Sequence, residues 1–234
     1  MNHIQIDSDL QNGIPLEKPP TALAFVDGQP YGVTRTSKAV PSSCAFWTEA
    51  ESGVFYAADE DHYNCTLGTM VMGFELPEEQ MNTLMTEVGM MCEMEYVREE
   101  EVPNVPKVEK QSSGIVYGPL AELPVDPDVV LLWVKPSQAM VVNETAGQMN
   151  WAASPAGVFG RPGCAAIPVA LSQGNVSQSF GCTGMRINSG ISDEYMLMAV
   201  PGDKIESLAE SLSHVTDVHA KLTDHYEQKA AALN

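Results

Sequence analysis

The chain has 234 residues, of which 44% are apolar, and its formal net charge at neutral pH is -19. A chain of this length and composition can bury a proper core, as one large globular domain or as two small ones. The excess of acidic residues excludes a nucleic-acid backbone or an anionic membrane surface as the expected partner, because both contacts need a local surplus of Lys and Arg.

The start of the chain carries no predicted export or membrane signal. No stretch approaches the roughly 20 apolar residues of a membrane-spanning helix, and the polar opening MNHIQIDSDLQNG lacks the basic and apolar regions of a signal peptide. We therefore expect a cytoplasmic protein. Its five cysteines, an odd number, are then better explained as thiols, metal ligands or reactive groups than as a disulfide framework.

Short apolar runs and turn residues define the predicted elements of the first half. Residues 21–26 are an apolar run of the length of a buried strand. The serines at 42–43 are typical of a helix start and put Cys44 in or just before the first helical turn. Residues 53–57 predict another strand, and the loop after it delivers Cys65.

A helix and a connector follow. Pro77 opens a helix whose apolar positions repeat every 3.6 residues. Cys92 lies at its Met-rich end and is interpreted as a core residue, since methionines and free cysteines are usually core filler. Residues 99–114 are acidic and contain prolines, and they predict a connector between two halves.

The second half repeats this order. Residues 128–134 predict a strand, Cys164 stands at a helix start, and Cys182 follows in a turn. The helix that begins at Pro201 has apolar residues at the same places as the helix that begins at Pro77, after an additional strand at 195–200. A final polar helix, 214–234, is expected on the surface or at a subunit contact; its few apolar residues are Val218, Leu222 and Tyr226.

Two stretches of the chain resemble each other. Residues 42–68 read SSCAFWTEAESGVFYAADEDHYNCTLG, and residues 161–186 read RPGCAAIPVALSQGNVSQSFGCTGMR. In each, a Cys-Ala pair opens a helix and a Cys-Thr pair precedes a glycine, so Cys44 corresponds to Cys164 and Cys65 to Cys182.

This similarity predicts an α+β fold. We expect a single domain made of two similar β-α repeats related by a pseudo-twofold axis, with mixed sheets and flanking helices. The predicted divisions are a duplicated domain at 14–213, with repeat one at 19–98, a connector at 99–114 and repeat two at 115–213, and a C-terminal helix at 214–234.

Equivalent loops of two such repeats can meet near the axis, so the four paired cysteines are predicted to converge on a metal. Four thiolates suit tetrahedral zinc or an iron-sulfur cluster. Structural zinc usually takes its cysteines in close pairs, whereas Cys44, Cys65, Cys164 and Cys182 come one from each loop. The pattern therefore favours an iron-sulfur cluster with a redox or small-anion-binding role, and zinc is the alternative.

The cysteines also allow other functions. A helix start lowers a thiol pKa, so Cys44 or Cys164 could serve a cofactor-free enzyme with His62 as a catalytic base, oriented by Glu60 or Asp61. A non-catalytic binding or assembly module, with the cysteines as plain core residues, stays open as well.

Two arginines flank the second cysteine pair. Arg161 and Arg186 are candidates to offset the charge of a thiolate cluster or to bind an anionic substrate, with Arg186 also assigned to catalysis. The predicted partners are a small anionic molecule or a redox protein, with neither nucleic acid nor membrane, and homo-oligomerisation is left open. The motifs of dinucleotide-binding, P-loop, serine-hydrolase and zinc-protease proteins are absent from the sequence.

Several segments together resemble domain-of-unknown-function family 169, over about residues 13 to 213. They are SSCAFW, GVFYAADEDHYNCTLG, IVYGPLAELPVDPDVVLLWVKPSQAM, GRPGCAAIPVAL, GCTGMR and MAVPGDKIESL. The resemblance implies a prokaryotic cytoplasmic protein without an assigned reaction. Thr66 stands after Cys65 where many relatives are expected to have proline. The positions that match the family motifs are Cys44, His62, Cys65, Arg161, Pro162, Cys164, Cys182, Gly184 and Arg186.

Overall fold

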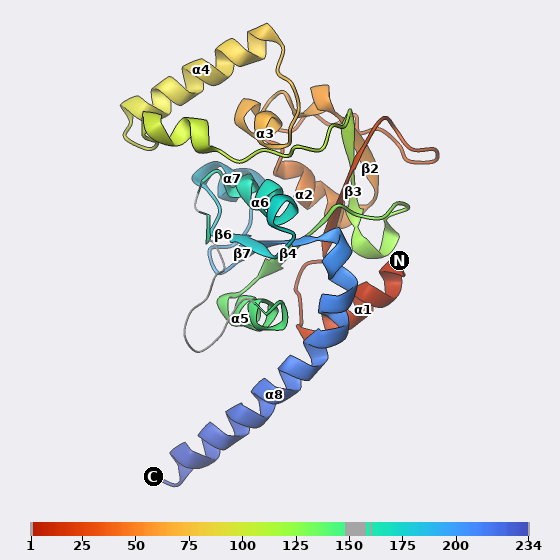
Figure 1. Ribbon diagram of the computed structural model, residues 1–234, viewed down its shortest axis with the longest axis vertical. Helices are drawn as coiled ribbons and strands as arrows, with labels where there is room; N and C mark the ends of the chain where they lie inside the picture. Colours follow the sequence, from red (N-terminus) through yellow and green to blue (C-terminus); the bar gives the residue numbers. More distant parts are fainter. Residues whose placement is uncertain (1, 148–157, 160, 234) are drawn as a thin grey trace.

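A seven-stranded sheet organises the part of the chain that the computed structural model describes, residues 2–147, 158–159 (backbone) and 161–233. The strand order is β2-β3-β1-β4-β7-β6-β5 (Figure 1). β5 and β6 pair in parallel, and the other described pairs are antiparallel. The strands are β1 (Thr21–Val26), β2 (Phe55–Ala58), β3 (Gly114–Pro119), β4 (Val129–Val134), β5 (Val158–Phe159), β6 (Ser177–Ser179) and β7 (Met196–Pro201).

This sheet confirms the coarse prediction of a mixed α+β protein with flanking helices. The strands predicted near 21–26, 53–57, 128–134 and 195–200 are β1, β2, β4 and β7. β3 and β6 were not separately predicted. β3 falls where the connector was expected to end, and its six residues are all buried.

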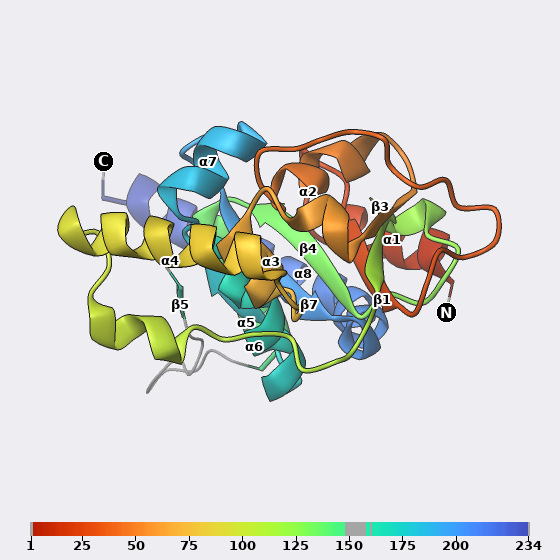
Figure 2. The ribbon, with the colours of Figure 1, turned by 90° about the horizontal axis from the view of Figure 1, so that it is seen from above.

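Helices cover both faces of the sheet. Alternate side chains of each central strand point to opposite faces and therefore enter two separate cores. Leu23, Tyr117 and Leu131 belong to one core, whereas Ala22 and Val130 belong to the other. The central strands are therefore apolar without interruption, as in sheets that are buried on both sides. The fold is a sheet between two helical layers (Figures 1 and 2).

One layer consists of the long helices α1 (His3–Gly13), α5 (Pro136–Thr145) and the first part of α8 (Ile205–Ala231). α1 and α8 approach closely at Gly13. A Cβ at this position would lie 2.6 Å from Cγ of Leu212, so only glycine permits this helix contact. Thr216 adds a hydrogen bond from its hydroxyl to the Gly13 carbonyl at 2.7 Å.

The other layer consists of four short helices. They are α2 (Ala45–Glu49), α3 (Thr66–Val71), α6 (Ala166–Gln173) and α7 (Thr183–Ser189). α6 is the most apolar of them, with residues 166–170 all buried. Each of these helices begins next to one of the four paired cysteines, so the cysteines all lie on this face of the sheet.

An excursion of the chain between α3 and β3 lies outside this second layer. It contains α4 (Glu78–Glu93) and the 3-10 segment η3 (Glu99–Asn104). Leu84 is the one buried residue among those of α4. Figure 1 shows α4 beyond α3, at the edge of the molecule.

The predicted correspondence between the helices at Pro77 and Pro201 is wrong. The first helix is α4, which lies outside the layer of short helices, whereas the second is α8, which packs on the opposite face of the sheet. A shared apolar period aligned two helices that occupy different places in the fold, because any amphipathic helix has this period.

The C-terminal half of α8 projects away from the body (Figure 1). Val218, Leu222 and Tyr226 expose 44%, 46% and 59% of their surface. This location agrees with the predicted surface helix, and the subunit contact stays a prediction. Among the described helices, none combines the length and apolar character required to span a membrane.

The two parts of α8 predict different responses to the same substitution. Leu212 is fully buried against α1, so Leu212→Ala should lower the free energy of unfolding by about 2 to 5 kcal/mol. Leu222→Ala, on the exposed part of the same helix, should change it by no more than about 0.5 kcal/mol. Urea titrations followed by circular dichroism measure both. Equal losses in the two variants would contradict this division of α8.

Candidate functional site

The four paired cysteines stand where short helices begin on one face of the sheet. Cys44 directly precedes α2, and Cys65 and Cys182 are the N-cap residues of α3 and α7. Cys164 lies in the 3-10 turn η5 (Gly163–Ala165), which leads into α6. Cys44 is buried, and the other three are partly buried.

Cys44, Cys164 and Cys182 belong to or pack against one core cluster, and Gly68 brings the loop of Cys65 against Ser43, the residue before Cys44. The pKa of Cys44 is raised to about 11, mainly by burial, with smaller contributions from the thiols of Cys65 and Cys182. Burial also raises the pKa of Cys164 well above its usual value, followed by contributions from each of the other three thiols. A charge on one sulfur is therefore felt by the others, although they lie far apart in the sequence.

Close backbone packing holds the loops in place. A Cβ at Gly68 would lie 2.7 Å from Sγ of Cys65 and 2.9 Å from Oγ of Ser43, so the two loops of the first half meet at this glycine. In the second half, a Cβ at Gly163 would lie 3.1 Å from Cα of Gly181. α2 and α7 are joined across the halves by a hydrogen bond from the Thr48 hydroxyl to the Ser189 carbonyl.

Hydrogen-bond donors surround the sulfurs. The amide of Met185 donates to Sγ of Cys182 at 3.4 Å, and Oγ of Ser42 lies 2.9 Å from Sγ of Cys44. The amides of Ser43 and Gly68 favour the charged form of Cys65, but burial outweighs them and raises its pKa. The described side chains include no group of three His, Cys, Asp or Glu residues placed to hold one metal ion.

The prediction of low thiol pKa values for Cys44 and Cys164 is wrong. Both pKa values are raised, and burial is the largest cause. A low-dielectric environment disfavours the thiolate, and helices as short as α2 offer too little dipole to compensate. The thiols of Cys44 and Cys164 are therefore neutral at pH 7 in the metal-free protein, and the helix starts do not activate them.

His62 is a core residue rather than an accessible base. Its surface is 1% exposed, and its ring contacts Phe46 and Phe74. Nδ1 donates to the Ala58 carbonyl at 2.7 Å, because a carbonyl oxygen only accepts, and Nε2 therefore accepts from the Tyr117 hydroxyl at 2.9 Å. Burial lowers the His62 pKa to about 4. Both ring nitrogens are thus occupied within the protein.

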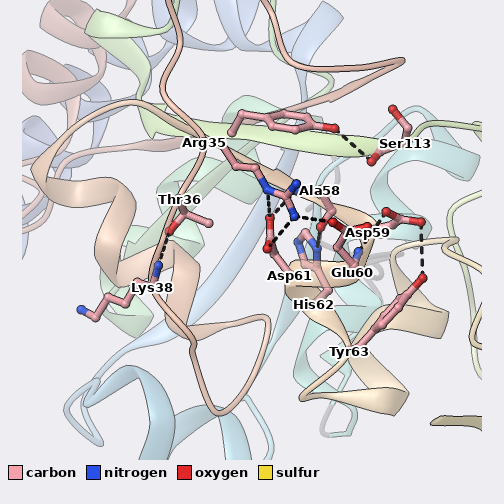
Figure 3. A network of polar contacts seen from close by, with 11 residues as sticks. Arg35, Thr36, Lys38, Ala58, Asp59, Glu60, Asp61, His62, Tyr63 and Ser113 are labelled. Carbon is pink, nitrogen blue, oxygen red and sulfur yellow. Dashed lines mark hydrogen bonds and ion pairs between the residues drawn. The ribbon is translucent and has the colours of Figure 1, made fainter. Parts of the chain in front are cut away.

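Glu60 and Asp61 accept hydrogen bonds from the Arg35 guanidinium, as Figure 3 shows. Arg35 donates to both Asp61 oxygens at 3.0 Å and to Glu60 at 2.7 Å. Asp61 also accepts from the Ala58 amide at 2.8 Å. The two carboxylates therefore fix the turn that contains His62, and neither of the imidazole hydrogen bonds involves them.

Tyr117 is a residue near the thiols that the sequence did not single out. It is fully buried on β3, and after burial the nearby thiols Cys44 and Cys164 are the causes that raise its pKa. A tyrosine inside the apolar run IVYGP is a weak signal by itself, since tyrosines are common in strands.

The two arginines near the second cysteine pair make different contacts. Arg186 donates to the carbonyls of Phe180, Ser192 and Tyr195, so its guanidinium fastens the segments on either side of α7. The guanidinium of Arg161 lies 4.5 Å from the ring centre of Tyr96 and 4.0 Å from Glu101, both in the excursion. Their predicted roles in substrate binding and catalysis stay predictions.

Cys92 does not belong to this group. It is partly buried on α4, among whose residues only Leu84 is buried, so its interpretation as a core residue is wrong. Its place on α4 separates it from the layer of short helices that carries the other four cysteines.

The thiol environments predict an order of alkylation in the metal-free protein. Cys44 is 8% exposed and its pKa is about 11, so iodoacetamide at pH 7.5 should modify it much more slowly than Cys92. Peptide mass spectrometry over time measures each site separately. Fastest labelling at Cys44 or Cys164 would restore the hypothesis of an activated thiol.

The buried imidazole predicts a pH-dependent stability. Because the His62 pKa falls from 6.5 in the unfolded chain to about 4 in the fold, the unfolded state takes up a proton first as the pH falls. Stability from this group is complete above pH 6.5 and decreases toward pH 4, with a loss of about 2 kcal/mol at pH 5. The His62→Gln variant should lack this loss in unfolding titrations at pH 7 and pH 5, whereas His225→Gln, on the exposed part of α8, should retain it.

The family match found by comparison with known proteins covers nearly the same residues as the folded body of the chain. The model of domain-of-unknown-function family 169, described as an uncharacterised ArCR family, matches residues 9–211 and ends before the exposed part of α8. The uncharacterised protein MJ0308 of Methanocaldococcus jannaschii is 27% identical over 170 residues, which cover 69% of this chain and 71% of that protein. No solved structure matches the chain. The resemblance noted from the sequence is confirmed, and the chain belongs to domain-of-unknown-function family 169.

Proposed function

We propose that Cys44, Cys65, Cys164 and Cys182 bind an iron-sulfur cluster in a protein with a redox or small-anion-binding role. The observation that carries this proposal is that four thiols from four separate loops stand at the starts of short helices on one face of the sheet. Four cysteine thiolates are the usual ligand set of such clusters. A bound cluster supplies one-electron transfer at a potential set by its surroundings.

The spacing of the cysteines along the chain, one from each loop, is the feature that favours a cluster over a single zinc ion, because structural zinc usually takes its cysteines in close pairs. Tetrahedral zinc holds each sulfur at about 2.3 Å, so its four sulfurs lie only roughly 4 Å apart. No three of the described thiols have such a placement. A cluster contains several irons and inorganic sulfides and holds its cysteines farther apart. Zinc remains the alternative outcome of the metal analysis.

The surroundings of the thiols suit an anionic centre. Amides donate to Cys182 and Cys65, and such hydrogen bonds stabilise thiolates and tune a cluster's potential. Arg161 and Arg186 lie in the loops of the second cysteine pair and add positive charge on that side. Because the thiol pKa values of Cys44 and Cys164 are raised, binding of metal must release protons and should strengthen with pH.

We also propose that the chain arose by duplication, and strand pairing supports it. β3 lies between β1 and β2, as β7 lies between β4 and β6, and β1 pairs with β4 at the centre. In the first half, the first residue of β1 faces the proline that ends β3, and the residue two before that proline faces the first residue of β2. In the second half, β4, β7 and β6 are paired in the same way. These pairs are Thr21–Pro119 and Tyr117–Phe55, and Val129–Pro201 and Ala199–Ser177.

Under this duplication the four cysteines take equivalent places. α2 and α6 follow the first cysteine of each half, and α3 and α7 follow the second. Gly73 and Gly190, each eight positions beyond the second cysteine, both adopt a positive φ. β3 then completes the first repeat, which extends to Pro119, and α4 with η3 becomes an insertion. This assignment moves the boundary from the connector at 99–114 to the turn before β4.

Anaerobic purification followed by iron, sulfide and zinc analysis tests the cluster. We expect near-stoichiometric iron and sulfide with visible absorption in the wild type, and loss of both in Cys182→Ser. The matched control Cys92→Ser should retain them, because Cys92 lies on α4 away from the site. Cys65→Ser serves as a second variant if Cys182→Ser does not fold.

Two results would contradict this proposal. One is a colourless, metal-free wild type purified without oxygen. The other is equal metal loss in Cys92→Ser and Cys182→Ser. Stoichiometric zinc without sulfide would replace the cluster by the zinc alternative at the same cysteines.

A further inference from the structure

A cavity of about 250 Å³ lies between α3, α4, η3 and the segment after η3, beside the core that contains the cysteines. All but one of the side chains that line it are apolar, and three of them are methionines. The lining residues are Leu67, Met70, Met81, Leu84, Met85, Val88, Val102, Pro103, Val105 and Lys107.

Lys107 is the charged residue of this lining, and no described carboxylate forms an ion pair with it. Of the twelve Lys and Arg residues, those outside the ion pairs of the described chain are Lys107, Lys221 and Lys229. Lys221 and Lys229 lie on the exposed end of α8. Lys107 is thus the unpaired cation on the folded body, in a chain whose net charge is -19.

The two acidic residues adjacent in sequence to the cavity lining, Glu101 and Glu87, have partners other than Lys107. Glu101, next to Val102, accepts from the amide and the guanidinium of Arg98 and lies 4.0 Å from Arg161. Glu87, next to Val88 on α4, accepts from the hydroxyl of Thr66 at 2.6 Å. The apolar cavity and its single cation are therefore left without an internal partner.

We propose that this cavity binds a small amphipathic carboxylate, with its hydrocarbon part among the methionines and its carboxylate at Lys107. At roughly 30 Å³ for each small group, the volume holds about eight such groups, enough for the hydrocarbon part of a medium-chain or simple aromatic carboxylate. Flexible methionine side chains adapt to such ligands. Apolar lining with one placed polar group is the usual composition of a small-molecule site.

This site is separate from the proposed cluster but touches the same helix. Leu67 and Met70 lie on α3, which begins at Cys65. A ligand in the cavity would therefore contact α3, the helix that has Cys65 as its N-cap residue. Binding itself requires no metal, so its test is independent of the cluster.

Calorimetric titration with octanoate and with octan-1-ol, using the full-length protein, tests the proposal. We expect octanoate to bind one site, and Lys107→Met to weaken it by about two- to fivefold while leaving octan-1-ol unchanged, since a solvent-exposed ion pair contributes little. Val88→Phe fills the cavity and should abolish binding of both ligands. Met90→Phe places the same ring on α4 outside the lining and should leave both affinities unchanged.

Methyl NMR of methionine-labelled protein locates the ligand. Octanoate should shift the methyl signals of Met70, Met81 and Met85, which line the cavity, and not that of Met94, which is exposed beyond it. Absence of octanoate binding at millimolar concentration, or equal affinity in Val88→Phe, would overturn the assignment. A dimer that is lost in Val88→Phe, without octanoate binding, would assign the cavity to a second copy of the chain instead.

Discussion

The antiparallel pairing of β1 with β4 is the contact on which the rest of the structure depends. It joins the two halves in the middle of the sheet, with Thr21 opposite Leu131 and Leu23 opposite Val129. Residues directly opposite in such a pair point to the same face, so the two halves share both of their cores. The short helices α2, α3, α6 and α7 cover one of these faces, and each begins next to one of the four paired cysteines.

Burial disfavours the charged form of the thiols, and a bound metal centre would offset that cost. Neutral thiols are tolerated in an apolar core, whereas unpaired thiolates are not, and the raised pKa values of Cys44 and Cys164 express this difference. The amides of Ser43 and Gly68 favour the charged form of Cys65 but are too few to reverse the effect of burial. Metal binding and proton release are thus expected to be coupled.

The excursion that contains α4 has a different physical character. Its main helix has one buried residue, and its methionines line a cavity or face solvent. Elements with so few buried contacts open more easily than the sheet. Arg161 connects this excursion to the loop of Cys164 through Tyr96 and Glu101, and Thr66 of α3 donates to Glu87 of α4, so the excursion is attached to the cysteine layer at both places.

Local pattern in the sequence determined the strands at 21–26 and 128–134, the helix starts at Cys44 and Cys164, and the family, because turn residues and apolar runs act over a few positions. Tertiary structure alone decided the sheet order, the position of β3, the burial of His62 and the direction of the thiol pKa values. These depend on which faces meet across the sheet and how much water they exclude. A helix start lowers a thiol pKa when considered alone, but the packing of the whole layer over Cys44 and Cys164 determines the outcome.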